Sequence, residues 1–263
     1  DKTGVKIPSE IRKLKGKKII HQTKIKKDEI AREVLKFASR GKRISVPATS
    51  ANLGPGFDAL GLALNLYNTC EFRLTDDGKS FESNLKENLI YKAYKFTFDY
   101  YKEKARPVTF DLEVDIPISR GLGSSAACIV MGVMAAFEVM GRDLDKKEIL
   151  KIATSIEGHP DNVSPAIFGA AGVSILEEGK VYLEKFEISK KFKFLTLVPD
   201  FRLSTEKARL ALPQTYPKAD AVFNIARVAM LVLALESGDA ANLKVALADK
   251  IHQPSRFDLI PEI

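Results

Sequence analysis

Two glycines in a short loop, placed between a strand pattern and a long apolar run, constrain the fold of this chain more than any other feature. Val108 to Ile116 alternates apolar and polar residues, which is the period-2 pattern of a half-buried strand. The run from Ser124 to Met140 is rich in Ala, Val and Met, and its length favours a buried helix over a strand. The loop from Pro117 to Ala127 holds Gly121 and Gly123. The sequence therefore predicts a strand, a tight loop and a buried helix in succession.

This loop and the start of the helix form a candidate phosphate site. Gly121 and Gly123 allow backbone conformations and a close approach that a Cβ atom would forbid. The helix start offers unpaired N–H groups and the positive end of the helix dipole, which together favour an anion. Ser124 and Ser125 add hydroxyls suited to a phosphate oxygen or a magnesium ion.

The glycine loop also resembles two other nucleotide-binding motifs in part. A Walker A loop needs Gly-Lys-Ser/Thr at its end, and no lysine stands there. Gly121 to Ala126 matches the looser G-x-G-x-x-A dinucleotide pattern, but a Rossmann unit then needs a second strand. Here Asp145 and Glu148 form a capping box that starts another helix. A dinucleotide site and a turn that serves packing alone remain the alternatives.

Two further polar segments stand out. Val46 to Asp58 combines flexible glycines and rigid prolines with Asn52 and Asp58, and we expect a loop that follows a short strand and holds polar groups beside a ligand. Glu157 to Asn162 is a polar run between a helix and an apolar segment, and taken alone it is typical of a turn with a helix N-cap.

The remaining patterns predict a mixed α and β protein without internal repeats. Strands are expected at Arg43–Val46, Leu66–Leu74, Val173–Leu176, Val181–Phe186 and Phe192–Pro199. Helices are expected at Asn88–Glu103, Lys146–Ile156, Ser204–Leu212, Lys218–Ser237 and Asp239–Lys250.

Charge is distributed unevenly along the 263 residues. Residues 1–43 hold 15 Lys and Arg against 5 Asp and Glu, whereas the rest holds 26 against 29. The basic signal therefore belongs to one terminal segment, which we interpret as a solvated extension with a short amphipathic helix at Asp28–Ser39. An arm for an anionic partner is the alternative, but we do not expect nucleic acid as a partner of the body.

The composition also limits where the protein works. No stretch approaches the roughly 20 uninterrupted apolar residues of a membrane helix, so we expect no membrane association. Cys70 and Cys128 lack the spacing of a disulfide framework or a zinc site, and a reducing cytoplasm fits best.

Together, the three polar segments resemble the GHMP kinases. VPATSANLGPGFDALGLAL at Val46–Leu64 and the sequence at Glu157–Gly169 are similar to homoserine kinases in particular, and Pro117–Ala127 is similar to the phosphate loop of the superfamily. The resemblance implies an α+β fold of two domains, one like ribosomal protein S5 and one ferredoxin-like. It also implies magnesium-dependent transfer of phosphate from ATP to the side-chain hydroxyl of L-homoserine, a step toward threonine.

The resemblance also implies roles for individual residues. The implied ATP-binding residues are Pro117, Ser119, Arg120, Gly121, Leu122, Gly123, Ser124, Ser125 and Ala126. The implied substrate-binding residues are Asn52, Asp58, His159, Asp161, Arg209 and Arg256, with the two arginines on the carboxylate of homoserine. The residues assigned to catalysis are Asn162, Asp58 and Ser124, and those assigned to Mg²⁺ are Glu157, Ser124 and Ser125.

The sequence also departs from the family pattern. The implied boundaries are a basic extension at 1–42, an ATP-binding domain at 43–190 and a C-terminal domain at 191–263 that lacks the family's Gly- and Ser-rich third motif. We expect this C-terminal domain to be incomplete, or the chain to compensate by forming a homodimer. A different small-molecule GHMP kinase and an inactive nucleotide-binding fragment are the alternative functions.

Overall fold

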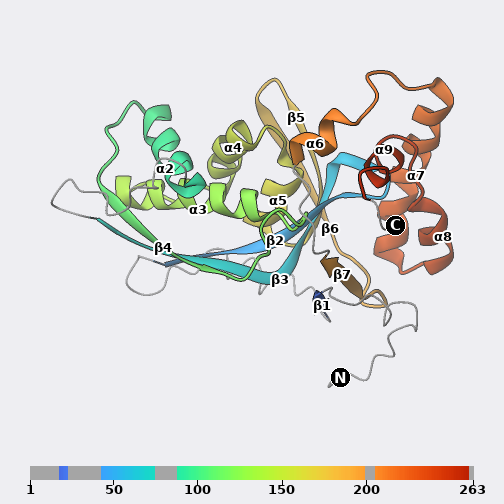
Figure 1. Ribbon diagram of the computed structural model, residues 1–263, viewed down its shortest axis with the longest axis horizontal. Coiled ribbons are helices and arrows are strands. Elements are labelled where there is room, and N and C mark those ends of the chain that lie inside the picture. The colour runs from blue at the N-terminus through green and yellow to red at the C-terminus, as the bar shows by residue number, and fades with distance from the viewer. Residues whose placement is uncertain (1–17, 23–42, 75–87, 199–204, 261–263) are drawn as a thin grey trace.

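The computed structural model describes residues 18–22, 43–74, 88–198 and 205–260, and these residues form an α+β fold (Figure 1). Its centre is a five-stranded antiparallel sheet in the order β2-β3-β5-β6, with β4 pairing the C-terminal half of β3. The strands are β2 (Arg43–Leu53), β3 (Gly56–Leu74), β4 (Val108–Val114), β5 (Ala171–Glu177) and β6 (Lys180–Phe186).

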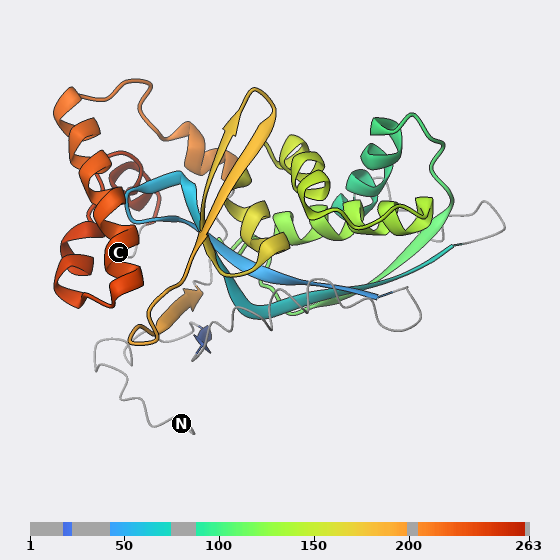
Figure 2. The ribbon, with the colours of Figure 1, turned by 180° about the vertical axis from the view of Figure 1, so that it is seen from behind.

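Four helices cover one face of this sheet (Figure 2). They are α2 (Leu89–Tyr100), α3 (Ser124–Met140), α4 (Lys146–Glu157) and α5 (Pro160–Phe168). Helix α3 has the bounds that its composition predicted, and its central residues from Ile129 to Phe137 are buried because α2, α4 and α5 pack around it. The carboxylate of Asp145 accepts a hydrogen bond from the Lys147 N–H, so Asp145 is confirmed as the N-cap of α4. The reciprocal half of the predicted capping box is not formed, because the Asp145 N–H donates to the Asp143 carbonyl oxygen and not to Glu148.

The β2–β3 connection corrects the sequence-based expectation. Val46–Asp58 is a hairpin: β2 continues to Leu53, and β3 begins at Gly56 after a tight turn. Two register shifts in the β2–β3 pairing, between Pro47 and Thr49 and between Ala51 and Leu53, hide the alternating pattern that would have predicted strands. Asn52 and Asp58 adopt left-handed φ angles of 58° and 54°, and the Asn52 carboxamide accepts the Asp58 N–H at 3.0 Å.

The C-terminal part consists of β7 (Phe194–Val198), α6 (Thr205–Leu210), α7 (Lys218–Ser237), α8 (Ala240–Ala246) and α9 (Gln253–Phe257). The expected helix at Asp239–Lys250 ends earlier, because Asn224 on α7 accepts the Lys250 N–H and Asp249 accepts three of the following N–H groups. Helix α9 was not predicted. None of the helices in the described ranges is long and apolar enough to span a bilayer.

Part of the basic N-terminal segment also differs from the expectation. Strand β1 (Lys18–Gln22) pairs antiparallel with β7, so these five residues are not a solvated extension. The amphipathic helix expected at residues 28–39 lies outside the described residues.

Candidate active site

The phosphate loop leads from β4 into the N-terminus of α3. Asn68 on β3 fixes the start of the loop, because its buried side-chain oxygen accepts the N–H groups of Asp115 and Ile116 at 2.9 Å each. Helix α3 begins after Gly123, which adopts a left-handed φ of 66° and offers no capping side chain. The first N–H groups of α3 thus have no side-chain cap and remain suited to an anion.

The predicted ATP-binding residues differ in whether their side chains or only their backbone can contact a ligand. Gly121 is exposed, adopts a left-handed φ of 70°, and has open space where a Cβ would point. The side chains of Leu122 and Ala126 are buried in the core, so only their backbone is available to a ligand. Ser119 shares the left-handed conformation with a φ of 57°, which is uncommon for a residue with a side chain.

A second group of oxygen atoms lies beside the start of α3. The Ser125 hydroxyl donates to a Glu157 carboxylate oxygen at 3.1 Å, which joins the first turn of α3 to the last residue of α4. Burial raises the pKa of Glu157, although His159 and the Ser125 hydrogen bond oppose the shift. Carboxylate and hydroxyl oxygens are hard ligands, so Glu157 with Ser124 and Ser125 fits Mg²⁺.

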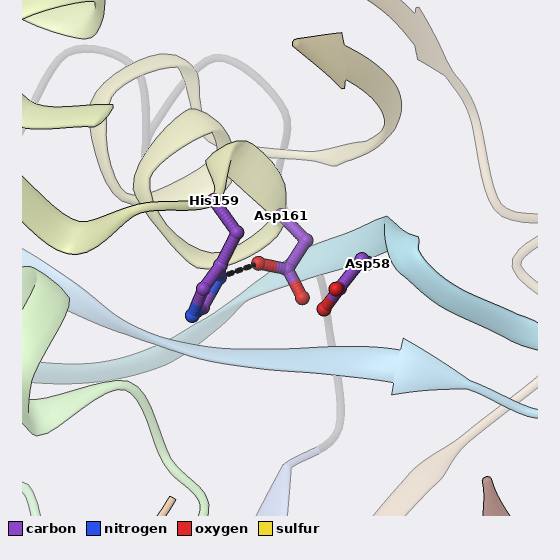
Figure 3. Close-up of side chains that lie close together, drawn as sticks. All are labelled: Asp58, His159 and Asp161. Carbon is purple, nitrogen blue, oxygen red and sulfur yellow. Dashed lines mark hydrogen bonds and ion pairs between the residues drawn. The ribbon is translucent and has the colours of Figure 1, made fainter. Parts of the chain in front are cut away.

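The predicted substrate residues meet where α5 approaches β3 (Figure 3). Asp58 on β3 receives a bidentate ion pair from Arg209 on α6, with N–O distances of 2.9 and 2.6 Å. One ligand atom from each of Asp58, His159 and Asp161 lies within 4.8 Å of the others, a spacing that would also suit a cation. Gly61 permits this approach, because a Cβ there would lie 1.9 Å from the Asp161 carbonyl oxygen.

Asp161 is buried, and only one of its two carboxylate oxygens has hydrogen-bond partners. Its Oδ1 accepts hydrogen bonds from His159 Nδ1 and from the Asn162 N–H, whereas its Oδ2 is buried without a partner. Figure 3 shows this second oxygen directed toward Asp58. Burial alone would lower the pKa of His159, but the hydrogen bond and the charge of Asp161 outweigh it and raise that pKa. A buried carboxylate oxygen without a donor is costly, which points to a cationic ligand at this position.

Phe57 brings the two predicted arginines together. The guanidinium carbon of Arg209 lies 5.4 Å from the centre of its ring, and that of Arg256 lies 5.0 Å away. The His252 ring stacks on Phe57 at 5.2 Å and bonds the Gly54 carbonyl oxygen at 2.7 Å. Burial, and then the charge of Arg209, lowers the pKa of Arg256. The two arginines therefore converge although α6 and α9 are far apart in the sequence.

Two residues of this site were not predicted from the sequence. Thr49 contacts both the phosphate loop and Asn162, and Phe57 supports the arginines. Both stand inside the segment Val46–Asp58 that the sequence had singled out. Their roles depend on contacts with residues more than 70 positions away, and no local pattern carries that information.

Comparison with known proteins agrees with this geometry. Residues 88–170 match the family described as GHMP kinases N terminal domain. A homoserine kinase from Clostridium beijerinckii is 46% identical over 225 residues, which cover 83% of this chain and 75% of that protein. One from Clostridium botulinum is 47% identical over 222 residues, with 82% and 75% covered.

A solved structure agrees as well. The crystal structure of homoserine kinase from Cytophaga hutchinsonii superposes with a TM-score of 0.69 at 26% identity, covering 86% of this chain and 78% of that one. The described residues thus have the GHMP kinase fold, of which the C-terminal part is covered only partially. The chain is a kinase and belongs to the homoserine kinase family.

Proposed function

We propose that this chain transfers the γ-phosphoryl group of ATP to the side-chain hydroxyl of L-homoserine, forming O-phospho-L-homoserine for threonine synthesis. The observation that carries the proposal is that one site holds both cationic and anionic side chains. Two arginines converge on Phe57, and a buried oxygen of Asp161 without a donor lies toward Asp58, the partner of Arg209. Homoserine carries a carboxylate for the arginines, an ammonium for the acidic side chains and an alcohol for phosphorylation.

Substrate recognition follows from the donors and acceptors of these residues. Arg209 and Arg256 would hold the carboxylate, since a guanidinium keeps further N–H donors when two of them bond Asp58. The ammonium would lie between Asp58 and the unpartnered oxygen of Asp161, which its charge would satisfy. Asn52 and His159 would complete the pocket around the hydroxyl-bearing side chain.

The nucleotide would bind with its phosphates at the start of α3. The backbone of the loop from Pro117 to Ala126 and the hydroxyls of Ser124 and Ser125 would contact them. Mg²⁺, held by Glu157 and these hydroxyls, would neutralise the negative charge of the phosphates when bound. The positive end of the α3 dipole acts in the same direction.

Catalysis would depend on alignment more than on a strong base. Phosphoryl transfer requires the hydroxyl and the γ-phosphate in line, with compensation of the spreading charge. Asn162 would donate a hydrogen bond at the reacting centre, Ser124 would hold the transferred group, and Asp58 would orient the hydroxyl. Asp58 already receives both nitrogens of Arg209, which favours orientation over proton abstraction as its role.

The deciding experiment is magnesium-dependent ADP release from ATP with L-homoserine, compared with mevalonate, galactose and L-serine. We expect turnover with L-homoserine far above that with the other three. Comparable turnover with mevalonate or galactose would instead assign the site to another GHMP kinase reaction. No release with any of them would contradict the kinase activity proposed for this chain.

We further propose the division of the chain that the family implies, with ATP binding by residues 43–190 and a C-terminal domain in residues 191–263. The position of the phosphate loop in the first part and of both arginines in the second supports it. Residues 1–42 would then be an addition to the catalytic body. A cytoplasmic location fits an enzyme of amino-acid synthesis.

A further inference from the structure

Thr49 occupies the point where the phosphate loop and the start of α5 meet. It lies on β2 at a register shift, and its side chain is fully buried. Its N–H donates to the Leu122 carbonyl oxygen at 3.1 Å, inside the phosphate loop. A Cβ on Gly123 would lie 1.9 Å from the Thr49 hydroxyl oxygen, so the second glycine of the loop makes room for this side chain.

The Thr49 hydroxyl determines how the Asn162 side chain is oriented. It donates to Asn162 Oδ1 at 2.9 Å, and the Asn162 N–H donates to Asp161 Oδ1 at 3.0 Å. A carboxamide has its acceptor at one end and two donors at the other. Once Oδ1 is held by Thr49, the NH₂ group is directed away from β2.

We propose that Thr49 is a positioning residue that holds the Asn162 NH₂ group at a fixed position relative to the phosphate loop. This inference rests on the proposed function, in which Asn162 donates to the reacting centre. Thr49 would keep a constant distance between two groups. One is the loop that would hold the phosphates, and the other is the amide that would contact the transferred group. Thr49 itself is buried and acts only through Leu122 and Asn162.

A pair of matched substitutions separates this role from simple packing. Thr49→Val has the same shape without the hydroxyl, and Thr49→Ser keeps the hydroxyl. In Thr49→Val we expect kcat to fall about 10- to 100-fold, because small misplacements of a reacting group have effects of this size. The KM values for ATP and homoserine should stay within about twofold, and Thr49→Ser should retain most of the turnover.

A double-mutant cycle tests whether the effect passes through Asn162. In an Asn162→Ala background, Thr49→Val should lower kcat no further, because the group that it positions is gone. Multiplied losses, or a loss equally large in Thr49→Ser, would overturn the positioning role. Thermal unfolding of the wild type, the three single variants and the double variant checks that the comparison is made between folded chains.

A measurement without turnover separates failure of this inference from failure of the proposed function. The side-chain amide signals of Asn162 in a ¹H–¹⁵N spectrum are identified by their loss in Asn162→Ala. We expect them to shift in Thr49→Val and to move far less in Thr49→Ser. Unchanged signals in Thr49→Val would overturn the inference, whereas a wild-type chain that turns over no homoserine would overturn the proposed function alone.

Discussion

At the scale of single residues, the aromatic ring of Phe57 lets two like charges lie close together. Arg209 and Arg256 both lie within cation–π distance of it, and Asp58 pairs with Arg209 in a bidentate ion pair. The attraction to the ring and to the carboxylate offsets the repulsion between the guanidinium groups. The result is a pair of neighbouring guanidinium groups, which suits the proposed binding of the substrate carboxylate.

The geometry of Arg209 leads to a first prediction. Arg209→Lys keeps the charge but loses the bidentate fork, so we expect the KM for homoserine to rise by about tenfold or more while the KM for ATP changes little. Steady-state ADP release at varied substrate measures both values. Arg227→Lys is the matched control, because Arg227 also stacks on a phenylalanine, Phe223, but lies on α7. Equal effects of the two substitutions would contradict a specific role for Arg209.

Asn162 leads to a second prediction at the same scale. Asn162→Ala removes the proposed donor at the reacting centre, and kcat should fall by about 100-fold or more, as for other donors of this kind. Substrate affinity should change much less. Asn242→Ala on α8, where the side chain donates to the helix-capping Asp239, serves as the control. An unchanged rate constant at saturation would remove Asn162 from the mechanism.

At the scale of elements, two glycines let helices α2 and α5 lie close to neighbouring backbone. Gly132 in the middle of α3 faces α2, and a Cβ there would lie 2.2 Å from the Ile90 carbonyl oxygen and 2.8 Å from the Ala93 Cβ. Gly61 has the corresponding role between β3 and α5. The second contact brings Asp161 to Asp58, so the site depends on a glycine that contributes no chemistry.

The α2–α3 contact predicts that Gly132→Ala destabilises the protein, although helix propensity alone would predict that it stabilises it. Gly to Ala in an open helix position stabilises by about 0.5–1 kcal/mol. Gly132→Ala should instead lower the free energy of unfolding by about 1–3 kcal/mol, because the added methyl overpacks the contact. Urea unfolding measures the change, with Glu138→Ala on the exposed side of α3 as the control. A more stable Gly132→Ala protein would show that α2 moves aside without cost.

At the scale of the whole molecule, the C-terminal helices α7, α8 and α9 lie beside the β2–β3 hairpin (Figure 1). Buried polar groups join the two parts. Asn224 bonds Asp249 at 2.6 Å, and Asp249 accepts the N–H groups of residues 251–253. His252 then bonds Gly54 at the hairpin turn. This network sets the position of Arg256 relative to Asp58, so part of the site depends on it.

The network predicts an acid-sensitive stability. Burial would raise the pKa of Asp249, but hydrogen bonds from Gln253 N–H and Asn224 outweigh it and lower the pKa. The contribution of a carboxylate with a lowered pKa is present above its unfolded value, about 3.9, and is lost as pH falls through the folded value. Asp249→Asn should cost about 1–3 kcal/mol at pH 7, and the difference from wild type should shrink toward pH 3. Urea unfolding across this range measures it; a constant difference would contradict the assignment.

The sequence by itself determined most of the regular local structure and the functional groups of the candidate site. The alternation from Val108, the apolar run of α3 and the N-cap at Asp145 are local signals, and the structure confirms each of them, with β4 ending at Val114 and not at Ile116. The three motifs also named most residues of the candidate site, because a resemblance to known kinases transfers residue by residue. The irregular hairpin escaped prediction, since its bulges break the period that identifies strands.

Only the tertiary structure decided which of these residues meet. Helix α9, the early end of α8, the support of both arginines by Phe57 and the contact of Thr49 with Asn162 all depend on partners distant in the chain. Such contacts arise when packing brings separate elements together, and a periodicity of two or 3.6 residues records only which face of an element is buried. The sequence therefore supplied the functional groups, and packing decided how far apart they lie and which charged groups are neighbours.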